Sequence, residues 1–193
     1  MLVNRSDLDA ANSSANITNL TKDKEDAQAV MDAIRDFNST SKEVLIGDSF
    51  DAIRTQLNNY AILMQERINA ADALLTAIKS ANDSLANYMD GEAKLDTDDY
   101  DEFKSIYDKA LLEIDSLTSR INSYDSDKET TSLESLKASL ASAEATAKKY
   151  KRLLDLLEGL PGADSSAYGT LSSGSAESDS FKSSVGEIVT IRY

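Results

Sequence analysis

Carboxylates are the main side chains in this sequence that could carry acid–base or metal chemistry. The chain has no Cys and no His, so it offers no thiol nucleophile, no Cys/His zinc site and no side chain that ordinarily titrates near neutral pH. The densest acidic run spans Asp96 to Glu102. A calcium loop counted from Asp96 needs Gly at its sixth position and Glu at its twelfth, but the chain has Asp101 and Tyr107 there. We therefore expect a helix cap in this run, with no metal, no cofactor and no catalytic pair, and we predict that the protein is not an enzyme.

The charge balance argues against two classes of partner. The sequence has 34 acidic and 20 basic residues, a formal net charge of -14. Phosphate backbones and anionic lipid surfaces require clustered Lys and Arg, so we expect no binding to nucleic acid. The first residues have no basic stretch followed by an apolar one, and no window approaches 18 consecutive apolar residues. We therefore expect no Sec signal peptide and no membrane insertion.

The composition predicts long helices. Aromatic residues make up 6% of the chain, there is no Trp, and the single Pro and five of the seven Gly lie beyond residue 158. Apolar periodicity predicts helices at about 6–38, 48–89, 98–124 and 132–158. The run Gly159–Gly162, which contains Pro161, predicts the end of the last one. The expected fold is all-α: an elongated helical bundle over residues 1–162, followed by a Ser/Gly-rich loop and a short C-terminal helix of the same domain over 163–193.

The segment from Asp48 to Met89 has the clearest pattern. Its apolar stripe alternates steps of three and four residues, and Arg67 is its only charged member. A period near 3.5 residues is typical of helices that supercoil around a neighbour, so this helix must have a partner. The stripe consists of Phe50, Ile53, Leu57, Tyr60, Met64, Arg67, Ala71, Leu74, Ile78, Ala81, Leu85 and Tyr88.

A lone glycine separates this segment from the one before it. Gly47 is the only glycine in the first 90 residues, and it closes the triplet Leu45-Ile46-Gly47. Because glycine is costly within a helix and well suited to a reversal, the triplet predicts the tip of a helical hairpin. At the far end of the second helix, Tyr88 and Glu92 lie four residues apart, an aromatic and an acid that could form a recognition element.

The order of helix, hydrophobic-x-Gly turn and longer helix resembles the WXG-type helical hairpins of type VII secretion. The triplet resembles the Leu-x-Gly variant that gives the LXG domains their name. The likeness continues to the end of the chain, where a Leu-rich helix at Leu153–Leu157, a Ser-rich stretch with Tyr168, and an apolar segment at Phe181–Val185 occupy similar places.

The resemblance implies a function. LXG domains are the N-terminal parts of polymorphic toxins of Gram-positive bacteria, and a toxin domain normally follows them. This chain is then expected to bind small helical WXG-like helper proteins and to direct export through the type VII secretion ATPase, from the cytoplasm and without a Sec signal peptide. The family's aromatic-x-x-x-acid export signal would map to Tyr88 and Glu92, although helper proteins can supply it instead. The heptads and acidic surface also fit an alternative, a coiled-coil spacer of a bacterial surface protein.

Overall fold

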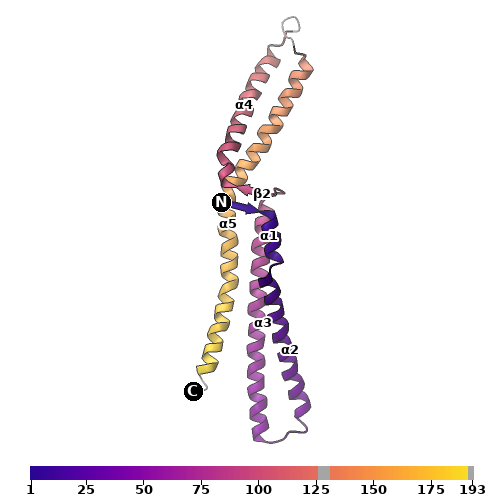
Figure 1. Cartoon of the computed structure of the whole chain (residues 1–193), viewed down its shortest axis with the longest axis vertical. Helices are drawn as coiled ribbons and strands as arrows, with labels where there is room; N and C mark the ends of the chain where they lie inside the picture. Colours follow the sequence, from indigo (N-terminus) through magenta and orange to yellow (C-terminus); the bar gives the residue numbers. More distant parts are fainter. Residues whose placement is uncertain (126–130, 191–193) are drawn as a thin grey trace. The chain divides into compact units, whose positions relative to one another are not determined.

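The chain is all-α, as its composition and periodicity predict. The computed structural model describes residues 1–125 and 131–190. Within them the elements follow in the order β1 (Leu2–Asn4), α1 (Arg5–Asn12), α2 (Ala15–Ser41), α3 (Asp48–Tyr88), β2 (Lys94–Asp96), η1 (Thr97–Asp99), α4 (Tyr100–Asn122) and α5 (Leu133–Thr190) (Figure 1).

Where the sequence predicts one bundle, the chain forms two compact units. The first unit comprises residues 1–5 and 88–163, and the second comprises residues 6–87 and the chain from Asp164 onward. Three helices contribute to both units: α1 supplies only Arg5 to the first, α3 supplies only Tyr88 to the first, and α5 is divided between Ala163 and Asp164.

The first unit is a helical hairpin with a small sheet at its base. The helix α4 packs against the beginning of α5 (Figure 1), and the ring centroids of Phe103 and Tyr150 lie 5.4 Å apart in an edge-to-face arrangement. The strands β1 and β2 pair antiparallel, with Val3 opposite Leu95. Further along the hairpin, the buried core consists of Leu117, Leu136 and Ala143, with Ile114, Ile121, Tyr124 and Leu140 against it.

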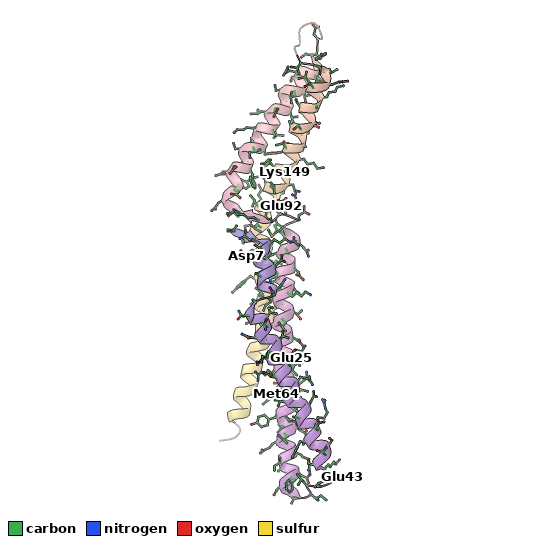
Figure 2. The ribbon with its side chains drawn as sticks, turned by 45° about the vertical axis from the view of Figure 1, so that its right-hand side comes forward. Asp7, Glu25, Glu43, Met64, Glu92 and Lys149 are labelled. Atoms are coloured by element: carbon green, nitrogen blue, oxygen red, sulfur yellow. The ribbon has the colours of Figure 1, made fainter. Side chains whose placement is uncertain are left out.

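The second unit is built on the hairpin of α2 and α3, which lie side by side (Figures 1 and 2). Ala27 and Met31 of α2 pack on Ile68 of α3 to form its core. Two ion pairs join the same helices: Lys24 Nζ lies 2.7 Å from an oxygen of Asp72, and Arg67 pairs with Asp23. The one charged residue of the predicted stripe is thus satisfied by the neighbouring helix.

Most helix bounds agree with the pattern, but the first one does not. The helix expected over 6–38 begins at Arg5 and is interrupted at Ser13 and Ser14, where the Ser14 side chain accepts from the Ile17 N–H and caps α2. Serine competes for backbone hydrogen bonds and is favoured at such caps, which explains the break. The two short strands were not predicted, because three residues are too few to show an alternating pattern.

The expected end of the last helix near residue 158 is wrong, and so is the loop expected after it. The helix α5 continues through Pro161 to Thr190, and residues 191–193 of that prediction lie outside the described residues. Pro161 removes one backbone donor, which a helix can tolerate when packing compensates. Leu157 and Leu160 are buried just before it, and Ala167 and Gly174 are buried after it, so tertiary contacts on both sides outweigh the poor local propensity.

Candidate functional site

The triplet Leu45-Ile46-Gly47 lies at the end of the connection between α2 and α3, which spans residues 42–47. Gly47 has φ of +123°, a backbone conformation that side chains with a Cβ rarely adopt. Its carbonyl accepts from the N–H groups of Phe50 and Asp51, at 2.9 and 3.1 Å, and so begins α3. A Cβ at this position would meet no atom within 4 Å, so the backbone angle and not crowding requires glycine.

Arg54 holds this connection from within α3. Its Nη1 donates to the carbonyl oxygen of Leu45 at 3.1 Å and to the carbonyl oxygen of Ser41 at 3.4 Å, while its Nη2 lies 2.6 Å from a carboxylate oxygen of Asp51. The Leu45 carbonyl lies beyond the end of α2 and Arg54 gives it a donor, whereas the Ser41 carbonyl also accepts from the N–H groups of Val44 and Leu45. Arg54 could not be identified from the apolar stripe, because it lies outside it. It lies nearly two turns into α3, and its position gives no distinctive signal in the sequence.

One side of the hairpin near this turn is apolar and exposed. Val30 and Phe37 are seven residues apart on α2, and Ile53 and Tyr60 are seven residues apart on α3, so each pair shares one side of its helix. Their exposed fractions are between 38% and 46%. We call these four residues the apolar side.

The other side of the same hairpin carries polar residues, together with the exposed Ile62 of α3. Asn38 Nδ2 donates to Asn58 Oδ1 at 2.7 Å, next to a cavity of about 170 Å³ that Arg35 also lines. With 3.6 residues per turn in two antiparallel helices, these residues project to one side of the contact line and the apolar side projects to the other. Ile53 and Tyr60 belong to the predicted stripe. The stripe is buried toward Tyr88, at Ala71, Ala81 and Leu85, whereas toward the turn Ile53 and Tyr60 are exposed and the stripe residues between and before them are half-buried.

Tyr88 and Glu92, the other candidate pair, do not share a helix face. The helix α3 ends at Tyr88, and Asp90 and Gly91 follow with φ of 48° and 84°. Both candidates instead contact α5. The Tyr88 hydroxyl donates to the carbonyl oxygen of Leu156 at 2.7 Å, and burial raises its pKa.

Glu92 forms an ion pair with Arg152 of α5. Arg152 also donates to the Asp90 carboxylate at 2.7 Å and to the Asp90 carbonyl oxygen at 3.2 Å. These hydrogen bonds, first the one to Asp90, raise the pKa of the guanidinium. Arg152 thus fixes the irregular turn after α3 against α5 of the first unit. The sequence analysis did not identify Arg152, since a single Arg in a Lys-rich helix gives no signal of its partner.

The acidic run serves as a cap. The Asp96 carboxylate accepts from the Asp98 N–H at 3.2 Å and lies 3.1 Å from Lys94 Nζ. The backbone hydrogen bond, and then Lys94, lower the pKa of Asp96 below its ordinary value. Among residues 1–125 and 131–176, no three carboxylates gather closely enough to hold a metal ion.

Comparison of the chain with protein-family models, with curated proteins and with solved structures finds no match. No helix in the described part of the chain is long and apolar enough to cross a membrane.

Proposed function

We propose that this chain is a non-enzymatic targeting module of an LXG toxin exported by a type VII secretion system. In this proposal the α2–α3 hairpin binds a small helical WXG-like helper protein, and the secretion ATPase recognises the complex. The chain then resides in the cytoplasm before export and leaves without a Sec signal peptide.

The exposed apolar side is the observation that carries the binding step. Val30, Phe37, Ile53 and Tyr60 lie on two adjacent helices at heptad spacing, a pattern that suits the groove-and-ridge packing of a further amphipathic helix. Exposed apolar residues grouped on one side of a hairpin are typical of interaction sites. The helix–LxG–helix order, and not the apolar side, supports the assignment to secretion.

The contacts of Tyr88 and Glu92 bear on whether this chain or a helper protein carries the export signal. Both side chains are engaged with α5, the first through Leu156 and the second through Arg152. A receptor would have to break these contacts before it could read the pair. We therefore assign the aromatic–acid signal to the helper protein in this proposal.

The binding step can be tested with a matched pair of substitutions. Ile53 and Ile62 are both exposed on α3, at 45% and 60%, but they are nine residues apart and so point to opposite sides of the helix. The chain would be co-expressed with the small proteins encoded beside it, followed by pull-down and by titration of any complex. We expect I53E to weaken the complex roughly tenfold or more and I62E to leave it nearly unchanged.

Export provides the second measurement. The chain would be fused to a reporter, and secretion would be compared between the unmodified fusion, I53E and I62E. Loss of export with I53E alone supports the proposal. Equal export of all three, or a monomer that captures no small helical protein, contradicts it and favours the spacer function.

A further inference from the structure

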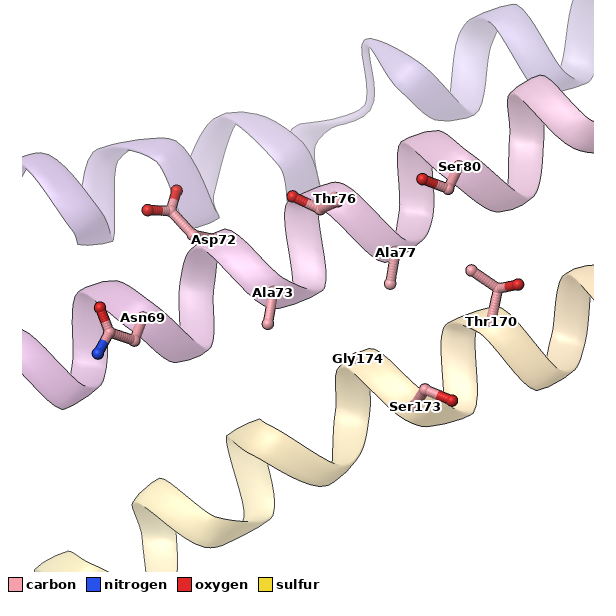
Figure 3. A pocket seen from close by; sticks show the side chains of 9 residues that line it. All are labelled: Asn69, Asp72, Ala73, Thr76, Ala77, Ser80, Thr170, Ser173 and Gly174. Atoms are coloured by element: carbon pink, nitrogen blue, oxygen red, sulfur yellow. The ribbon is translucent and has the colours of Figure 1, made fainter.

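The distal segment of α5, residues 164–190, belongs to the second unit, where Thr170, Ser173 and Gly174 lie beside α3 (Figure 3). Its composition is poor for a helix. It contains three of the chain's seven glycines, Gly169, Gly174 and Gly186, and a third of its residues are serines. Both residue types favour other backbone conformations, so this segment is helical chiefly where something holds it.

Little buried apolar surface attaches this segment to the rest of the second unit. Within residues 164–176, only Ala167 and Gly174 are buried. The two large apolar side chains of this stretch, Tyr168 and Leu171, are exposed. In the part of α5 that belongs to the first unit, by contrast, Leu153, Leu154, Leu157 and Leu160 are all buried.

The contact with α3 is a close approach of small residues. An added Cβ at Gly174 would lie 2.4 Å from the Ala77 Cβ and 3.1 Å from the Ala73 carbonyl oxygen. Figure 3 shows Ala73 and Ala77 directed toward α5 at this point. Beside the contact, a cavity of about 510 Å³ extends between the helices and is lined mainly by polar or small side chains, including Asn69, Thr170 and Ser173.

The segment also begins at a weak point of the helix. Pro161 has no N–H to donate to the carbonyl of Leu157, and Gly162 follows it. A helix can open here without breaking a full set of backbone hydrogen bonds.

From these features together we propose that the distal segment is a releasable strap. It exchanges between a docked state, in which Gly174 packs on α3, and a released state, in which it leaves α3 while the α2–α3 hairpin stays folded. Release uncovers the face of α3 that carries Ala73 and Ala77. This inference does not depend on the proposed function, since release needs no partner.

Hydrogen exchange of the full chain gives the first test. We expect amides of residues 164–176 to exchange at least about tenfold faster than those of the facing stretch of α3, residues 69–80, because they open by local release. Equal protection of the two stretches would overturn the proposal.

Two glycine substitutions give the second test. G174L should displace the segment, whereas G169A adds a side chain where no atom lies within 4 Å. Because the chain has no Cys, spin labels on S80C and S172C report the distance between α3 and the segment. We expect G174L to remove the short-distance population and to raise exchange in residues 164–176 at least about tenfold, with exchange in residues 27–68 unchanged. G169A should keep the short distances. Unchanged distances in G174L, or exchange that rises throughout the hairpin, would refute a releasable strap.

Discussion

We predict that the effect of G159A on the stability of the protein depends on whether residue 88 is Tyr or Phe. A Cβ added at Gly159 would lie 2.2 Å from the Tyr88 hydroxyl oxygen and 3.2 Å from Cζ of the same ring. G159A must therefore push the ring away and break the hydrogen bond to Leu156. Losing that bond costs about 1 kcal/mol and overpacking costs about 1–3 kcal/mol, while alanine gains about 1 kcal/mol over glycine in a helix. We expect a net destabilisation of about 1–3 kcal/mol.

In a Y88F background the clashing oxygen is gone, and only the tight contact with the ring carbon remains. There we expect G159A to be neutral or to stabilise by up to about 1 kcal/mol. G162A is the control, because a Cβ at Gly162 meets no atom within 4 Å, and it should stabilise by about 1 kcal/mol in both backgrounds. The four variants and their controls would be compared by urea unfolding followed by circular dichroism. If G159A has the same effect with Tyr and with Phe at position 88, the assigned contact is wrong.

Three further predictions concern the turn and the cap. G47A should destabilise by about 1–2 kcal/mol through backbone strain alone, and an unchanged melting temperature would contradict the positive φ. R54M should cost about 1–2 kcal/mol by removing the donor to the Leu45 carbonyl and one of several donors to the Ser41 carbonyl, and hydrogen exchange should rise first at the end of α2 and in the connection after it. The pKa of Asp96 is lowered from 3.8, so its stabilising effect is complete above that value and is lost as pH falls through the lower, folded-state pKa. D96N should therefore be less stable than the parent at neutral pH, and the difference should shrink in acid titrations monitored by circular dichroism; a constant difference down to the lowest pH would contradict this.

The helices that the sequence predicted well are those with a long apolar stripe and clear ends. The bounds expected for α3, 48–89, differ from Asp48–Tyr88 by one residue, because Gly47 and Gly91 bracket a continuous pattern. The error at α5 has the opposite origin. Gly159, Pro161 and Gly162 are strong local signals, and the burial of Leu160 and Gly174 that outweighs them depends on contacts distant in sequence.

The candidate residues show the same limit. The turn at Gly47 follows from a local backbone requirement, which a sequence displays directly. The surroundings of Glu92 depend on Arg152, 60 residues later, and no spacing rule connects the two. Arg54 lies nearer to the carbonyls it binds, but it is one of many charged residues near helix ends. Side-chain contacts between residues that are distant in the sequence could therefore not be predicted from the sequence alone.

The exposed residues of the α3 stripe, Ile53 and Tyr60, bear on the choice between a targeting module and a spacer. Where the stripe nears Tyr88, neighbouring segments bury it; near the turn, Ile53 and Tyr60 keep more than a third of their surface in water. A spacer gains nothing from apolar residues at heptad spacing on its surface, since they favour association without contributing to its own core. A docking module needs such residues grouped on one side; the opposite side carries polar residues such as Asn38 and Asn58, and the exposed Ile62. For this reason we favour a docking role over a spacer role, while the proposed link to secretion rests on the helix–LxG–helix order, and the comparison of I53E with I62E tests the docking step.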